Sequence, residues 1–171
     1  RAGVNAGNSI ASGGNYNVVV GDEAGTAITT GDSNVALGTY ALFLNSTSSD
    51  NTAVGTSALS QNTAASNTGV GKAALTSNTS GATNVAVGAL ALDANTTASN
   101  NTAVGYASLG ANTTGANNTG VGRESLLVNT TGASNTALGS TSLDANTTGS
   151  FNTAIGQASL TASTTASNNT A

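Results

Sequence analysis

The sequence predicts an all-β solenoid, and three observations lead to that prediction. Along the chain of 171 residues, a glycine recurs at intervals of seventeen residues, with one interval of sixteen. A short strand-like segment precedes each of these glycines, and a leucine follows most of them four residues later. Repetition at a fixed short period is the sequence signature of stacked coils, in which each unit packs on its neighbours.

The repeat glycines define the period. Successive glycines of this set lie seventeen positions apart in seven of eight cases, and Gly55 and Gly71 lie sixteen apart. The unit reads N-[TV]-[AG]-[VLI]-G-x-x-[AS]-L-x-x-N-[TS]-[TSA]-x-x-x, with its clearest copies starting at Asn101 and Asn135. Each glycine is expected to provide a bend or a positive φ angle. The repeat glycines are Gly21, Gly38, Gly55, Gly71, Gly88, Gly105, Gly122, Gly139 and Gly156.

The residues before each glycine form a short predicted strand. In the third unit, Thr52 and Val54 share one face and Ala53 lies on the other, because side chains alternate along a strand. We expect the face with the larger, β-branched residues to point inward. The position between them is alanine or glycine from the second unit on, which suggests that another chain packs closely against that face.

The second half of each unit contains the leucine and then a turn. The leucine segment is compatible with a second short strand or with one helical turn, and Asn-Thr-Thr-Gly is typical of a turn. The ten asparagines that open the units, from Asn17 to Asn169, are expected to stack and to hydrogen-bond between coils. About nine coils with strands roughly 4.8 Å apart would make a rod about 40 Å long. The predicted core leucines are Leu42, Leu59, Leu75, Leu92, Leu109, Leu126, Leu143 and Leu160.

The apolar content of each unit predicts an oligomer. One valine-type side chain and one leucine per coil bury little apolar surface against the conformational entropy that the whole unit loses when it becomes ordered. Shared packing through the alanine and glycine face would add to the core. We therefore expect a homo-oligomer, either a trimer or a filament, with the chain itself as its principal partner.

The repeat units resemble two groups of fibre proteins. Units of the form NTAVG followed by Ala-Leu and NTTG are similar to the head repeats of trimeric autotransporter adhesins and to the repeat shafts of phage tail fibres. The resemblance covers roughly residues 17–171 and implies a trimeric β-roll at a cell or virion surface. The adhesin repeat is shorter than the unit of this chain, so the shape and handedness of the coil stay open.

Composition excludes several functions. The chain has no His and no Cys, which removes the common nucleophile–base pairs of hydrolases, and its seven carboxylates are scattered. The net charge is −4, and the three basic residues Arg1, Lys72 and Arg123 do not form the basic cluster that is typical of a nucleic-acid-binding surface. No apolar run approaches the ~20 residues of a membrane span. We expect no enzyme, no cofactor and no metal site.

Glycosylation is a candidate modification, since the N-x-[ST] pattern occurs at nine asparagines. Most of them fall in the predicted turn, where a glycan would be accommodated on the surface. The alternative is that Asn and Thr are simply common turn residues. The candidate sites are Asn45, Asn78, Asn95, Asn100, Asn112, Asn117, Asn129, Asn146 and Asn168.

Three functions fit these observations. The first is a structural shaft of an extracellular fibre or filament, and the second is an adhesin head that binds a host or matrix ligand. The third is ice binding through the threonine rows. The strand threonine is replaced by valine in some units, which suits an inward position better than an ice-facing array. The predicted organisation is a cap or junction over residues 1–16, or a weak continuation of the array, followed by a solenoid over residues 17–171 cut from a longer array.

Overall fold

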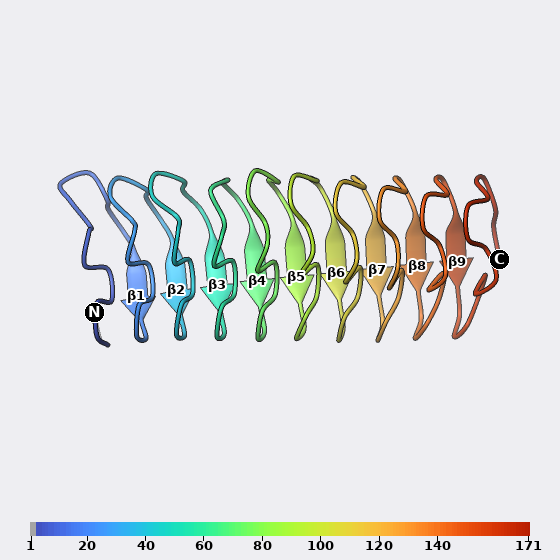
Figure 1. Cartoon of the computed structure of the whole chain (residues 1–171), viewed down its shortest axis with the longest axis horizontal. Coiled ribbons are helices and arrows are strands. Elements are labelled where there is room, and N and C mark those ends of the chain that lie inside the picture. The colour runs from blue at the N-terminus through green and yellow to red at the C-terminus, as the bar shows by residue number, and fades with distance from the viewer. Residues whose placement is uncertain (1–2) are drawn as a thin grey trace.

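The computed structural model describes residues 3–171 and is a parallel β-solenoid without a helix in that range. Nine strands of three residues each follow one another along a rod, with eight turns of chain between the first and the last (Figure 1). The strands are β1 (Val18–Val20), β2 (Val35–Leu37), β3 (Thr52–Val54), β4 (Thr68–Val70), β5 (Val85–Val87), β6 (Thr102–Val104), β7 (Thr119–Val121), β8 (Thr136–Leu138) and β9 (Thr153–Ile155). The predicted solenoid and its strands are confirmed.

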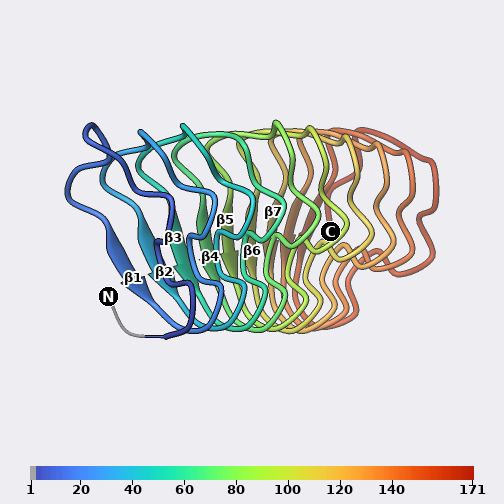
Figure 2. The ribbon, with the colours of Figure 1, turned by 60° about the vertical axis from the view of Figure 1, so that its left-hand side comes forward.

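All nine strands form one parallel sheet in sequence order, along one side of the stacked coils (Figure 2). Each residue pairs with its equivalent one unit later, as Thr102 does with Thr119. Backbone hydrogen bonds continue beyond the strands, from Thr102 N to Asn118 O (2.9 Å) and from Gly105 N to Val87 O (2.8 Å). Equivalent residues of successive coils therefore form straight rows along the rod.

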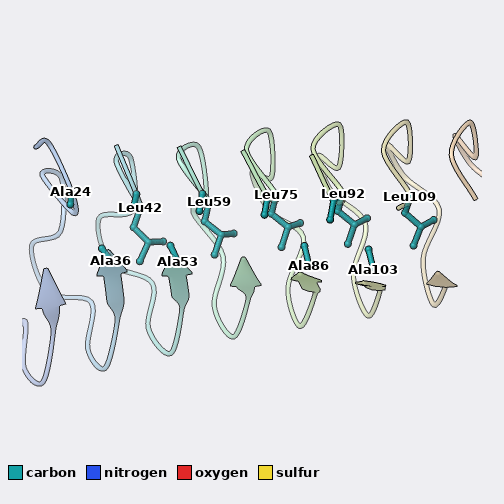
Figure 3. Packing of buried hydrophobic residues seen from close by; sticks show 14 of the residues in the cluster. Ala24, Ala36, Leu42, Ala53, Leu59, Leu75, Ala86, Leu92, Ala103 and Leu109 are labelled. Atoms are coloured by element: carbon teal, nitrogen blue, oxygen red, sulfur yellow. The ribbon is translucent and has the colours of Figure 1, made fainter. Parts of the chain in front are cut away.

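The strands face the opposite way from the prediction. The central alanine is fully buried, as at Ala53 and Ala103, whereas the flanking residues are partly or largely exposed, as at Leu138 with 47% exposure. The reason is steric. A leucine from the preceding unit reaches the inner face of the strand, as Leu59 does at Gly69, and only a small residue leaves room for it (Figure 3). The expectation that the alanine and glycine face lies open to another chain is therefore wrong.

The core leucines are confirmed. Seven are fully buried, and Leu160 is partly buried against the same cluster. Their segment is neither of the two structures considered, because it is a turn in which non-glycine residues alternate into the left-handed region. Tyr40 has φ 59° and Leu42 has φ 49°, with the buried Ala41 between them. The same alternation recurs in the later coils and curls the chain back over the strand.

The repeat glycines hold the coils at their close spacing. Gly55 has φ 131°, and a Cβ atom at this position would lie 2.6 Å from the carbonyl oxygen of Gly71 in the next coil. A side chain is therefore excluded by the backbone conformation and by the neighbouring backbone. The predicted positive φ is found at all nine repeat glycines.

The opening asparagines form the predicted ladder. The backbone N–H of Asn118 donates to Oδ1 of Asn101 (2.9 Å), and Nδ2 of Asn118 donates to Gly132 O (2.8 Å). The same backbone-to-Oδ1 contact joins every successive pair from Asn17 to Asn169. Each opening asparagine thus bonds to a neighbouring coil, which satisfies polar groups that would otherwise destabilise the interior. Nδ2 of Asn101 is an exception, because it is buried and has no hydrogen-bond partner.

One departure from the repeat shows how tightly the coil interior is filled. In the coil of β1, Gly25 stands where other units have leucine, and the larger Val19 and Ile28 fill the space. A Cβ atom at Gly25 would lie 2.8 Å from Cδ1 of Ile28.

The one shortened unit loses its residue in the turn between Asn62 and Asn67, so that β3 and β4 keep their register.

Residues 3–16, part of the segment assigned to a cap or junction, lie against the coil that contains β1. The N–H of Gly7 donates to Ala24 O (2.9 Å), and Ala6 is fully buried. Gly7 and Ile10 repeat the spacing of Gly25 and Ile28. Arg1, at the start of that segment, lies outside the described residues.

The reversed strand face is tested by adding the same kind of side chain on either side of one strand. Ala103→Val should lower the free energy of unfolding by about 1–3 kcal/mol, because the added methyl groups overlap the core leucines. Thr102→Val on the outer face should change it by no more than about 0.5 kcal/mol. Urea unfolding followed by circular dichroism measures both, and equal losses would contradict the assignment.

Candidate functional site

The outer side of the sheet is the most regular surface of the molecule, and we call it the sheet face. It consists of the first and third residues of every strand, because the second points inward. The first row contains Val18, Val35, Thr52, Thr68, Val85, Thr102, Thr119, Thr136 and Thr153. The second row contains Val20, Leu37, Val54, Val70, Val87, Val104, Val121, Leu138 and Ile155.

The sheet face is uncharged, with a wholly aliphatic second row and a first row of six threonines and three valines. Its exposed members range from 36% exposure at Val104 to 60% at Ile155, and none of the eighteen positions in its two rows is ionisable. Nine of the eighteen positions are exposed, six of them in the second row. Rows of exposed aliphatic side chains are common on surfaces that contact another molecule. The parallel register spaces equivalent side chains at about 4.8 Å, so the face is also a regular array.

The candidate glycosylation asparagines fall into two groups. Asn45, Asn78, Asn95, Asn112, Asn129 and Asn146 are fully buried. In all six turns Nδ2 donates to the carbonyl oxygen three residues later, as from Asn112 to Gly115 O at 2.9 Å. The folded coil leaves no room for a glycan on these amides.

The remaining three candidates, Asn100, Asn117 and Asn168, are exposed. Each immediately precedes an opening asparagine, at the edge of the sheet face. Glycosylation at these positions stays a prediction.

The buried turn asparagines from Asn62 to Asn146 form a second ladder that sequence reasoning did not find. Asn45 lies outside it, because its Oδ1 has no hydrogen-bond partner. Nδ2 of Asn129 donates to Oδ1 of Asn112 (2.8 Å), and Asn112 donates in turn to Asn95 (3.1 Å). The ladder stops at Asn146, whose Oδ1 has no hydrogen-bond partner because the next coil has Ser163 at this position. The sequence did contain a signal for this ladder, because seven consecutive units have asparagine at this position while the neighbouring turn residues vary.

Charged and aromatic side chains do not gather into a site. Over residues 3–171 there is no group of three metal-ligating side chains and no pocket, and the ion pair found is Arg123–Glu124 (3.0 Å). Burial raises the pKa of the Asp93 carboxyl, against the opposing effect of backbone hydrogen bonds. Tyr40 and Phe43 meet edge to face at 5.4 Å between ring centroids, apart from the other aromatic residues. The described chain also has no helix long and apolar enough to cross a membrane.

Comparisons with known proteins do not identify a relative. No protein-family model, no curated protein and no solved structure matches this chain.

The buried ladder is tested by one isosteric change made at two asparagines of the same coil. Asn112→Asp removes the Nδ2 donor and buries a carboxylate, so it should lower the free energy of unfolding at pH 7 by about 3–5 kcal/mol. Asn117→Asp at the exposed position should change it by about 0.5 kcal/mol or less.

The pH dependence of the unfolding free energy of Asn112→Asp is a second test of the ladder. Burial without a cationic partner would raise the folded-state pKa of the new carboxyl above its unfolded value of about 3.9. The destabilisation is therefore present above the folded pKa and shrinks as the pH falls towards 4. Similar losses for both variants at every pH would contradict the ladder.

Proposed function

We propose that this chain is a structural segment of an extracellular fibre and that its copies associate through the sheet face. The observation that carries the proposal is the uncharged sheet face, whose second row is valine, leucine or isoleucine in all nine strands and is exposed in six of them. Burial of exposed apolar surface is the main source of free energy for protein association. The rod form, with one continuous sheet along its length, is also what a shaft requires.

The location of the proposed interface differs from the one expected from the sequence. The inner alanines and glycines already pack against leucines of this chain, so they offer no surface to a second chain. The outer rows lack such a cover within the chain. Three copies, as the resemblance to trimeric fibres implies, would bring three sheet faces around one axis.

An adhesin head that binds a host or matrix ligand is the alternative within the same assembly. It would need a surface patch that departs from the repeat. The most exposed aromatic residues, Tyr16, Tyr106 and Phe151, lie on different coils far apart along the rod. The structural role therefore has the stronger support.

Ice binding is a second candidate function, and one observation favours it. The strand threonines point outward in register, whereas the sequence predicted an inward position that disfavours an ice-binding array. Regular rows of threonine methyl and hydroxyl groups match the regular spacing of a crystal surface. The second row, however, varies between valine, leucine and isoleucine, which suits packing against protein better than contact with a flat lattice.

Self-association is tested by charging the sheet face. The purified chain should be an oligomer by light scattering, and Val87→Lys with Val104→Lys should dissociate it, because each lysine would be buried without a partner. Thr114→Lys, on an exposed turn, is the matched control and should leave the oligomer intact. A monomeric wild-type chain at high micromolar concentration would overturn the proposal.

Ice binding has its own measurement. If the sheet face contacts other copies, the oligomer should show no thermal hysteresis in a nanolitre osmometer. Hysteresis in the wild-type chain that disappears in the variant with both valines replaced by lysine would establish the second function instead.

A further inference from the structure

A row of exposed hydroxyl groups follows the turns of the solenoid, and we call it the hydroxyl row. It consists of the ninth residue after each repeat glycine, in the turn that comes after the leucine segment. This residue is threonine or serine in eight of nine coils, and all eight are exposed. The row contains Thr30, Thr47, Ser80, Thr97, Thr114, Thr131, Thr148 and Thr165.

The hydroxyl groups of this row do not bond within the fold. No hydrogen bond within residues 3–171 involves a side-chain oxygen of the row. The threonine directly before the row behaves differently, because Oγ1 of Thr113 donates to Thr130 O (3.1 Å) and Oγ1 of Thr130 donates to Thr147 O (3.0 Å). Two adjacent threonines of one turn thus have different roles, since one hydroxyl joins two coils and the other faces solvent.

Folding does not explain why this position keeps a hydroxyl group. The residue directly after each repeat glycine also reaches the surface, and it varies widely, as at Asp22, Lys72 and Tyr106. Turn chemistry alone would accept asparagine, aspartate or glycine in place of threonine. The one coil without the hydroxyl has Ala64, in the shortened turn. Every full-length turn therefore retains a hydroxyl group that is available to another molecule.

The hydroxyl row also coincides with the six buried glycosylation patterns. Each of these N-x-[ST] tripeptides ends on a residue of the row, as Asn112-Thr113-Thr114 does. Asn112 is fully buried and its Nδ2 is bonded to Gly115 O, whereas Thr114 is exposed. The accessible nucleophile of these tripeptides is therefore the hydroxyl oxygen and not the amide nitrogen.

Charge distinguishes between two modifications of a hydroxyl group. A phosphate group carries nearly two negative charges at neutral pH, and successive positions of the row are only about 4.8 Å apart. Phosphates on successive coils would therefore repel one another along the rod. Lys72 and Arg123, the basic residues of the described chain, lie directly after repeat glycines and not in these turns. A neutral sugar has no such repulsion.

We propose that the hydroxyl row is a series of O-glycosylation sites with a nucleoside diphosphate sugar as the donor. The hydroxyl oxygen attacks the anomeric carbon of the sugar, and a new carbon–oxygen bond forms. The bond from that carbon to the phosphate oxygen breaks, the nucleoside diphosphate leaves with the electron pair, and the hydroxyl proton passes to a base of the transferase. The chain supplies only the acceptor oxygen.

The proposal is independent of self-association, because no residue of the hydroxyl row belongs to the sheet face. Segments rich in serine and threonine carry O-linked sugars on other extracellular stalks. Sugars on the turns would surround part of the rod with hydrated groups and leave the sheet face uncovered.

Mass spectrometry of the chain purified from the organism that makes it tests the proposal. After denaturation, trypsin cleaves after Lys72 and Arg123 and releases residues 73–123, which include three residues of the hydroxyl row. Electron-transfer fragmentation keeps O-linked sugars attached and assigns each one to a residue. Sugars are expected on the row, as at Thr114, and not on the bonded threonines, as at Thr113.

Two pairs of substitutions in the same peptide give a matched comparison. Thr97→Val with Thr114→Val should lower the largest number of sugars on the peptide from three to one, because only Ser80 of the row remains. Thr96→Val with Thr113→Val should leave this number at three. Circular dichroism of both variants confirms that they are folded.

Three results would overturn the proposal. The first is an unmodified peptide from the natural protein, and the second is phosphate in place of sugar on the row. The third is an equal loss of sugars in the two pairs of variants, because accessibility would then not select the acceptor. None of these results bears on association through the sheet face, which light scattering measures separately.

Discussion

The contact between the small residue at the centre of each strand and the leucine that crosses the coil is the constraint on which the rest of the structure depends. Each coil encloses room for one leucine and one alanine or glycine, and for little more. Where the strand carries the larger Val19, the leucine is replaced by Gly25 and the space is filled by Ile28. Because the small residue must point inward, the β-branched residues on either side of it point outward.

Much of the architecture could be predicted from the sequence. The period, the short strands, the positive φ of the repeat glycines and the opening asparagine ladder all follow from strict repetition. The direction of the strand face could not be predicted, because a two-residue alternation fits either face and hydrophobicity favoured the wrong one. The deciding feature is the path of the leucine segment, which depends on left-handed residues such as Tyr40 and Leu42 that give no such signal in sequence.

The location of the candidate site could not be predicted from the sequence, and association between chains stays a prediction. Association between chains was expected, but the surface assigned to it was the alanine face, because the facing of the strand was reversed. The turn asparagines illustrate a related difficulty. Asn112 matches a glycosylation pattern and a common turn residue equally well, and only the packed coil shows that its amide bonds between coils.

The shortened unit between Gly55 and Gly71 has a consequence for how such a rod can vary. The turn between Asn62 and Asn67 is one residue shorter, yet β3 and β4 remain paired residue for residue. Length changes are therefore absorbed on the turn side and are not passed on to the sheet. A foreign peptide inserted directly after Asn62 would be displayed from the rod without disturbing the pairing of β3 with β4.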